Sequence, residues 1–367
     1  MKKIFVFFRY SLLLIVVLTI LTSFSSCIHQ EEKVRVSWFD ADGVLIESKY
    51  VPKDYDPTKR DLPNENDKWY YVGWEISVSE DGFICQAKRK EKQHIVWEDY
   101  DGAILNEVFL LEDEDVPSFE LPSPTDRWVY DNWKEESKGT QTVFRAQRSP
   151  NVDFFIGNVF QIVIKDVDGK AIGTGSGFII NDEGWFITNN HVMESASSAI
   201  AFFDIEDRDR GLKYTQLDVL GGVYNSGEKD IFIGKLANYD KIKDYYNNID
   251  FTQEYSTGEI SYTVGYPNSS VKMEINSGVI LDEYSNIYDK INGIYYVLSD
   301  SYIAPGSSGG ILINENFEVI GITTIGLYAD EYKQVYTAGG SIPTLTFYSQ
   351  LSNLDETKIK NLTNIYN

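Results

Sequence analysis

The stretch SYIAPGSSGG, residues 301–310, decides how the rest of the chain is interpreted. It places Ser308 in a Gly-x-Ser-Gly-Gly sequence, directly before the apolar run 311–313. Glycines on both sides allow backbone conformations that are closed to other residues. Such a loop can expose one serine oxygen and aim backbone N–H groups at an anion that forms beside it. Taken by itself, the segment also fits a Gly/Ser turn between two strands.

A nucleophilic serine needs a base within hydrogen-bond reach, and the base needs an orienting partner. The chain has three histidines, and only His191 lies beyond residue 150. It ends a strand-like run, at a place where a side chain can face a cleft. We therefore expect His191 to be the base that serves Ser308.

The orienting carboxylate should lie between His191 and Ser308 if the order along the chain is His, Asp, Ser. Asp230 directly precedes the apolar strand pattern 231–236, where a carboxylate can be shielded and can hold one imidazole tautomer. We prefer it over five alternatives, of which the first three lie in or beside a run of mixed charge that fits a solvated loop: Asp204, Asp207, Asp209, Asp218 and Asp240.

Short strand-like runs separated by turn signals extend from about residue 152 to about residue 343. Strands without interspersed helices predict an all-β barrel or sandwich. Residues 345–354 carry apolar side chains at helical spacing, which predicts one closing helix packed on a barrel. The last dozen residues are polar and are expected to fray.

Three blocks of the sequence resemble those of trypsin-like serine proteases of the HtrA/Deg type. The histidine, aspartate and serine blocks are residues 173–192, 229–236 and 299–310, and further matches lie at 264–267 and 320–324. The resemblance spans about residues 155–350. It implies two six-stranded antiparallel β-barrels (the chymotrypsin fold), with His191, Asp230 and Ser308 in the cleft between them.

The resemblance also implies roles for neighbouring residues in a serine endopeptidase that needs no cofactor. The backbone N–H groups of Gly306 and Ser308 would form the oxyanion hole. By position, a pocket for a small or medium apolar substrate residue would be lined by Tyr302, Ile303, Thr323, Thr324 and Ile325. Two departures are Ser307, where asparagine is common in the family, and the lack of a PDZ-like segment after residue 350. PDZ-driven regulation is therefore not expected.

The first 150 residues contain a repeat. At an offset of 59 the coinciding residues include Trp38/Trp97, Trp69/Trp128, Trp74/Trp133 and Arg89/Arg148, so six of the seven tryptophans are paired. Each copy opens with alternating residues and an Asp-Gly turn, which predicts a hairpin. We expect the tryptophans to form cores rather than a binding platform. Asp40 and Asp42 are expected to form a turn rather than a calcium loop. The copies loosely resemble β-repeats of bacterial surface proteins that act as stalks or adhesive modules.

The N-terminus has the pattern of a secretory signal, with Lys2, Lys3 and Arg9 before a short apolar run. Cys27 follows it as in bacterial lipoproteins, which predicts lipidation and a membrane anchor in the bacterial envelope; an ordinary cleaved signal is the alternative. The expected organisation is a signal peptide (1–26), a tether (27–33), two β-repeats (34–91 and 92–150), a protease domain (151–350) and a tail (351–367).

Charge and cysteine usage exclude several classes of function. Removal of residues 1–26 changes the formal net charge from −23 to −26, the wrong sign for a nucleic-acid binder. With Cys27 lipidated, Cys85 is left alone, so neither an internal disulfide nor a cysteine zinc site is expected. One histidine beyond residue 150 also argues against a metal-dependent hydrolase. The remaining alternative to a protease is a catalytically silent surface protein that binds or adheres.

Overall fold

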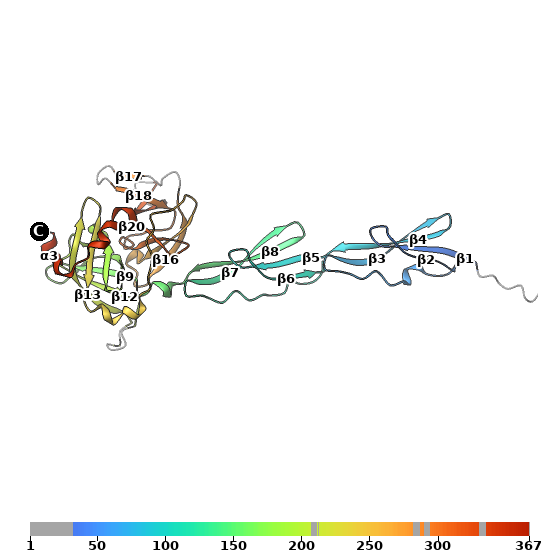
Figure 1. Cartoon of the computed structure of the whole chain (residues 1–367), viewed down its shortest axis with the longest axis horizontal. Coiled ribbons are helices and arrows are strands. Elements are labelled where there is room, and N and C mark those ends of the chain that lie inside the picture. The colour runs from blue at the N-terminus through green and yellow to red at the C-terminus, as the bar shows by residue number, and fades with distance from the viewer. Residues whose placement is uncertain are drawn as a thin grey trace, which may run out of the picture. The chain divides into compact units, whose positions relative to one another are not determined.

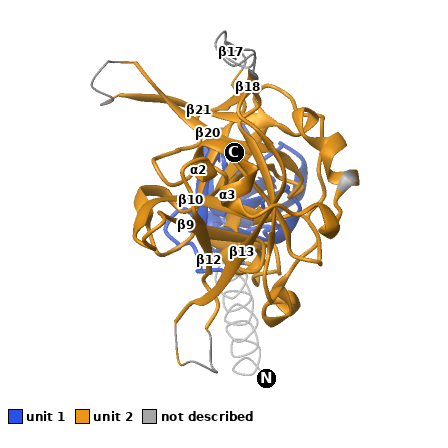
Figure 2. Cartoon of the chain, turned by 90° about the vertical axis from the view of Figure 1, so that its left-hand side faces the viewer, with its two compact units in different colours: residues 1–121, 132–147 blue, residues 122–131, 148–367 orange. Residues whose placement is uncertain are grey.

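The computed structural model describes residues 32–206, 211, 213–281, 287–289, 294–329 and 335–366 (Figure 1). The predicted signal peptide, Cys27, Asp207 and Asp209 lie outside the described residues. The chain divides into two compact units, residues 1–121 with 132–147 and residues 122–131 with 148–367 (Figure 2). Within the part that is described, no helix has the length and apolar character needed to cross a bilayer.

Two four-stranded sheets occupy the N-terminal part of the described chain. The first, in the order β2-β1-β4-β3, contains β1 (Lys33–Phe39), β2 (Leu45–Pro52), β3 (Trp69–Ser79) and β4 (Gly82–Glu91). The second, in the order β6-β5-β8-β7, contains β5 (Gln93–Glu98), β6 (Ile104–Leu110), β7 (Trp128–Lys138) and β8 (Gln141–Pro150). Both have a parallel central pair, with Trp38 opposite Cys85 in one and Trp97 opposite Phe144 in the other. The sheets thus match in register at the offset of 59 seen in the sequence.

The Asp-Gly segments form the turns that begin each sheet. Asp40 accepts hydrogen bonds from the backbone N–H groups of Asp42 and Val44, so its carboxylate shapes the turn. Gly43 has a φ of +83°, a conformation that favours glycine. Trp38 and Trp97 are 0% and 2% exposed and therefore lie in the cores of their sheets.

A closed six-stranded barrel follows, in the order β10-β11-β14-β13-β12-β9. Its strands are β9 (Val159–Lys165), β10 (Ala171–Ile179), β11 (Trp185–Thr188), β12 (Ser198–Phe203), β13 (Thr215–Ser226) and β14 (Ile231–Leu236). Phe160, Phe186 and Phe232 are fully buried inside it and pack edge to face or tilted. Closure leaves this sheet without a free edge.

The second barrel is a seven-stranded sheet, in the order β16-β15-β19-β20-β21-β18-β17. Its strands are β15 (Ile260–Gly265), β16 (Glu274–Val279), β17 (Ile287–Asp289), β18 (Ile294–Ser299), β19 (Ile311–Asn314), β20 (Val319–Tyr328) and β21 (Tyr336–Pro343). An isolated bridge from Ile280 to Ser299 brings the end of β16 to the end of β18. The first six strands therefore curl into a half-barrel, and β17 is an additional strand. The all-β, double-barrel prediction is confirmed, with the second barrel less completely closed than expected.

The C-terminal segment differs from the prediction in two ways. In place of one α-helix over 345–354 there are two 3₁₀-helices, η6 (Thr344–Thr346) and η7 (Tyr348–Asn353). Phe347 separates them with non-helical dihedral angles because it is fully buried in the second barrel's core, and tertiary packing overrides the helical spacing.

The last residues are also packed rather than frayed. Lys360 pairs with Gly222 of β13, and α3 (Leu362–Ile365) lies against the first barrel with Leu362 only 3% exposed. The remaining helical turns are η1 (Pro57–Lys59), η2 (Val152–Phe155), η3 (Tyr239–Lys241), η4 (Lys243–Tyr245), η5 (Pro267–Ser269) and η8 (Glu356–Lys358).

Truncation of Leu362 tests whether the C-terminal segment stabilises the first barrel. We expect Leu362→Ala to lower the free energy of unfolding by about 2–5 kcal/mol, because it leaves a cavity in the barrel core. Urea unfolding of the full chain, followed by near-UV circular dichroism, measures the change. The matched control is Leu345→Ala, since Leu345 is 68% exposed and its truncation should change stability by less than about 0.5 kcal/mol. Equal effects from the two variants would contradict a packed C-terminus.

Candidate active site

His191 and Asp230 are joined by two hydrogen bonds. His191 lies in the short helix α2 (Asn190–Met193), which begins just after β11 ends. Its Nδ1 is 2.8 Å from Asp230 Oδ2, and its backbone N–H donates to Asp230 Oδ1 at 2.8 Å. Both carboxylate oxygens of Asp230 thus bind His191. These two bonds fix the orientation of the imidazole, with its Nε2 directed away from Asp230. Of the described alternatives, Asp204, Asp218 and Asp240 do not take this place.

Asp230 is held in an unusual backbone conformation. Its φ of +50° lies in the left-handed region, which aspartate tolerates better than most residues.

The carboxylate of Asp230 is 14% exposed and the imidazole of His191 45% exposed, so solvent reaches the histidine side of the pair. Partial burial by itself lowers the pKa of His191, but the hydrogen bond and charge of Asp230, with the charge of Glu194, outweigh it. The pKa of His191 therefore lies above its ordinary value of 6.5.

Ser308 is linked to the His191–Asp230 pair through Asn189 and Thr324. The Ser308 hydroxyl donates to the backbone carbonyl of Thr324 at 3.1 Å. The fully buried Asn189 amide donates to Thr324 Oγ1 at 3.0 Å and to Asp230 O at 3.2 Å. Among the described residues, no hydrogen bond joins Ser308 directly to His191. Sequence reasoning missed Asn189, although it stands two positions before His191.

The loop that carries Ser308 leaves two backbone donors open. Over residues 303–310 the N–H groups donate to partners within the fold, except that Pro305 has no N–H and that Gly306 and Ser308 find no acceptor among the described residues. Gly306 has a φ of +99°, and a Cβ there would lie 2.5 Å from Tyr266 O. Only glycine fits at this position, and the loop ends with two unused N–H groups at the predicted positions.

Ser176 of β10 supports this loop from the first barrel. Its fully buried hydroxyl donates to Gly306 O at 2.7 Å and accepts from Tyr266 N–H at 2.9 Å. Its backbone N–H donates to Ser308 O at 2.7 Å. Sequence reasoning did not single out Ser176, because its partners lie about 90 and 130 residues further along the chain. The only signal was its place in the glycine-rich run 173–177.

The predicted pocket residues divide by exposure. Tyr302 and Ile325 keep surface that a substrate could contact, whereas three are buried: Ile303, Thr323 and Thr324. Tyr302 is 42% exposed, with its ring tilted against Tyr336 at 5.2 Å, and Ile325 is partly buried. Ile303 is 2% exposed and packs on Gly339, where an added Cβ would lie 2.3 Å from Ile303 Cδ1. Tyr336, which the sequence did not suggest, fixes this region by donating to Ser301 O and accepting from Ile303 N–H.

Thr323 and Thr324 turn their hydroxyls into the fold. Thr323 is 1% exposed and donates to Ser307 O at 2.6 Å. Thr324 is 5% exposed and donates to Ile322 O at 2.9 Å. Side chains so deeply buried offer a substrate little surface. Ser307, the departure from the family pattern, accepts a hydrogen bond from Ala304 N–H through its own hydroxyl.

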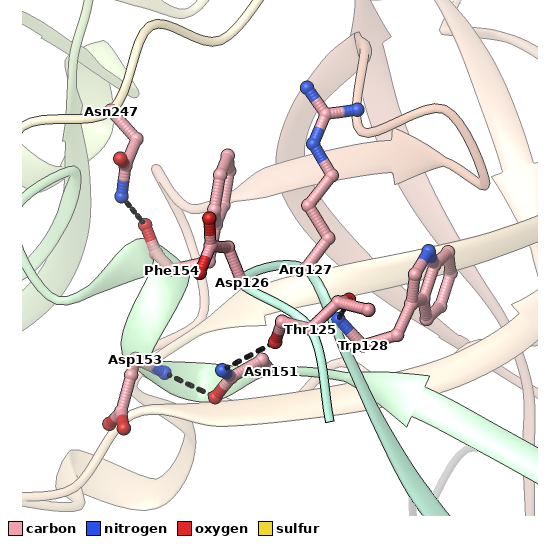
Figure 3. Close-up of a pocket in the computed structure, with 8 residues that line it drawn as sticks. All are labelled: Thr125, Asp126, Arg127, Trp128, Asn151, Asp153, Phe154 and Asn247. Carbon is pink, nitrogen blue, oxygen red and sulfur yellow. Dashed lines mark hydrogen bonds between the residues drawn. The ribbon is translucent and has the colours of Figure 1, made fainter. Parts of the chain in front are cut away.

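Two cavities are lined by residues other than those of the candidate site. One, of about 660 Å³, is lined by Thr125–Trp128, Asn151, Asp153, Phe154 and Asn247 (Figure 3). Two of its polar side chains form hydrogen bonds with the protein backbone. Asn247 donates to Phe154 O, and Asn151 donates to Thr125 O and accepts from Asp153 N–H. The other, of about 310 Å³, is lined by Lys229 and residues of the second barrel. Among the described residues, no group of three or more His, Cys, Asp or Glu side chains is arranged to hold a metal ion.

Comparisons with known proteins bear on the same region. Residues 175–322, which contain His191, Asp230 and Ser308, match the family described as "Trypsin-like peptidase domain". A "Probable periplasmic serine endoprotease DegP-like" of Hahella chejuensis is 26% identical over 178 residues, covering 48% of this chain and 33% of the relative. "Serine protease Do-like HtrA" of Bacillus subtilis is 28% identical over 181 residues, covering 47% and 37%.

A solved structure, "Crystal structure of the serine endoprotease from Yersinia pestis", aligns with 55% of this chain and 65% of its own at 21% identity and a TM-score of 0.41. The chain spans about a third of the length of the curated relatives it matches. The family match and these relatives identify residues 175–322 as a trypsin-like serine peptidase domain of the HtrA type.

Proposed function

We propose that the protein is a serine endopeptidase in which Ser308 is the nucleophile, His191 the general base and Asp230 the group that orients the base. The observation that carries this proposal is the double contact of Asp230 with His191, at Nδ1 and at the backbone N–H. A histidine held in this way presents Nε2 as the acceptor for a serine proton. The Gly306 and Ser308 N–H groups, which have no acceptor within the described part of the chain, are the matching oxyanion donors.

The proposed reaction starts with a rotation of the Ser308 side chain. The hydroxyl leaves Thr324 O, turns to His191 Nε2 and attacks a peptide carbonyl as the imidazole takes its proton. The carbonyl oxygen becomes an oxyanion that accepts hydrogen bonds from Gly306 and Ser308. The C–N bond then breaks, the imidazolium gives its proton to the leaving amine, and water hydrolyses the acyl-enzyme by the same steps. Asp230 stabilises the imidazolium throughout without taking its proton.

The substrate proposed is a protein or peptide, with a small or medium apolar residue before the cleaved bond. Tyr302 and Ile325 offer partly exposed apolar surface, and the packing of Ile303 against Gly339 limits the depth of the pocket. The curated relatives include proteins named as periplasmic endoproteases, and the N-terminal 26 residues have a secretory pattern. These two facts support a place in the bacterial envelope, where Cys27 would carry a lipid anchor.

The nucleophile can be tested with a fluorophosphonate probe. We expect the full-length protein to be labelled at Ser308 and Ser308→Ala to lose all labelling, because only an activated serine reacts. Gel fluorescence and peptide mass mapping measure the extent and the site. Ser198→Ala, an exposed serine at the start of β12, is the matched control and should label normally. A folded wild-type protein that does not react would favour a silent, binding protein instead.

The pH dependence of labelling tests the base. His191 must be neutral to accept the proton, so the rate should rise with pH through a midpoint above the ordinary pKa of 6.5. In Asp230→Asn the main cause of the raised pKa is gone and burial remains, so the midpoint should move down. The rate should also fall, by up to about 10⁴-fold, since the tautomer is no longer held. Rates measured from about pH 5 to about pH 9 show both effects. An unchanged midpoint in Asp230→Asn would contradict the pairing.

The anchor has its own test. If Cys27 is lipidated, the mature N-terminal peptide isolated from a bacterial expression host should begin at Cys27 and carry a diacylglyceryl group by mass spectrometry. Cys27→Ser should then release the protein from the membrane fraction. Recovery of an unmodified N-terminus from membrane-free fractions of the wild type would show an ordinary cleaved signal.

A further inference from the structure

An amide N–H can be aimed through the carbonyl on the other side of its own peptide bond. The peptide unit is planar and trans, so the C=O of one residue and the N–H of the next point in opposite directions. A group that fixes the C=O therefore fixes the direction of the N–H. For the two open donors of this site, the carbonyls to consider are those of Pro305 and Ser307.

Ser307 O is held by two donors. The Thr323 hydroxyl donates to it at 2.6 Å, and Gly310 N–H donates to it at 2.9 Å. The Gly310 bond lies within the turn that carries Ser308, so it shapes the turn without fixing it against the barrel. The Thr323 bond comes from β20 of the second barrel and therefore fixes the turn relative to that barrel.

Thr323 engages this turn with all three of its polar groups. Its N–H donates to Gly310 O at 2.9 Å, and its carbonyl accepts from Gly309 N–H at 2.9 Å. Its hydroxyl donates to Ser307 O, so Thr323 is bonded to the turn on both sides of Ser308. The side chain is 1% exposed, so water does not compete for these bonds.

The other open donor is fixed by backbone alone. Pro305 O accepts a hydrogen bond from Asn268 N–H at 2.6 Å, which sets the direction of Gly306 N–H. No side chain enters that bond, so no simple substitution removes it. The Ser307–Ser308 peptide is the one whose direction depends on a side-chain hydroxyl.

We propose that Thr323 is a positioning residue, whose hydroxyl fixes the Ser307–Ser308 peptide so that Ser308 N–H faces the substrate carbonyl. This inference rests on the proposed serine-endopeptidase function. It gives Thr323 a different role from the one expected from the sequence, which was to line the substrate pocket. The distinction is measurable. A pocket wall affects how tightly a substrate binds, whereas a group that aims an oxyanion donor acts only as negative charge develops in the transition state.

The test is the isosteric variant Thr323→Val in the full chain, treated with the fluorophosphonate probe over a range of concentrations. The maximal labelling rate should fall by about 10-fold, less than the about 10²–10³-fold loss for deletion of an oxyanion donor. The half-saturating probe concentration should stay unchanged. Thr323→Ser keeps the hydroxyl and should restore most of the rate. If Thr323→Val does not fold, Thr323→Ala, which needs less space, should show the same fall.

Thr344→Val is the matched control for stability. Thr344 is also fully buried in the second barrel and donates its hydroxyl to a backbone carbonyl, that of Val319, at 2.9 Å. It should lower the melting temperature about as much as Thr323→Val and leave the labelling rate unchanged. An unchanged rate in Thr323→Val, or a change only in the half-saturating concentration, would overturn this inference alone. An unlabelled wild type would overturn the proposed function and this inference with it.

Discussion

The structure of the site depends on how one buried turn satisfies its backbone polar groups. Residues 306–310 run between β10 of the first barrel and β20 of the second, and all of them except Ser308 are buried. Buried N–H and C=O groups must find partners, and here the partners come from both sides, Ser176 and Thr323. The two donors left over are those of Gly306 and Ser308. Because the other N–H groups of this turn are bonded within the fold, these two are the ones that remain available to the proposed oxyanion.

The sequence was informative where chemistry limits the choice of residue. His191 could be selected because it is the one histidine beyond residue 150, and Asp230 could be preferred over five other aspartates because it stands at the mouth of an apolar strand. Ser176 and Asn189 could not be selected from the sequence, and Thr323 was named only by position, as a residue of the substrate pocket. Each is a small polar residue of a kind that occurs throughout the chain, and each acts through hydrogen bonds to residues 16 to 135 positions away. Such bonds exist only after the barrels have folded.

The fold shows the same division between local and tertiary information. The offset of 59 carried over into the register of the two hairpins, with Trp38 opposite Glu47 and Trp97 opposite Asn106, because their alternating residues and Asp-Gly turns specify hairpins locally. The C-terminal segment was misjudged for the opposite reason. Its apolar spacing suits a helix, but burial of Phe347 and the pairing of Lys360 with Gly222 are imposed by the barrels. A short apolar pattern is decided by what it packs against.

Three residues of the candidate site have positive φ angles, and only Asp230 among them is not a glycine. Asp230, Gly306 and Gly309 have φ values of +50°, +99° and +87°. A non-glycine residue in the left-handed region costs of the order of 1–3 kcal/mol and persists only where its surroundings over-determine it. Asp230 meets that condition, because both of its oxygens are hydrogen-bonded to His191 and its carbonyl to Asn189. The carboxylate that holds the imidazole is therefore also fixed at its own backbone, so the orientation of His191 and the conformation of residue 230 are coupled.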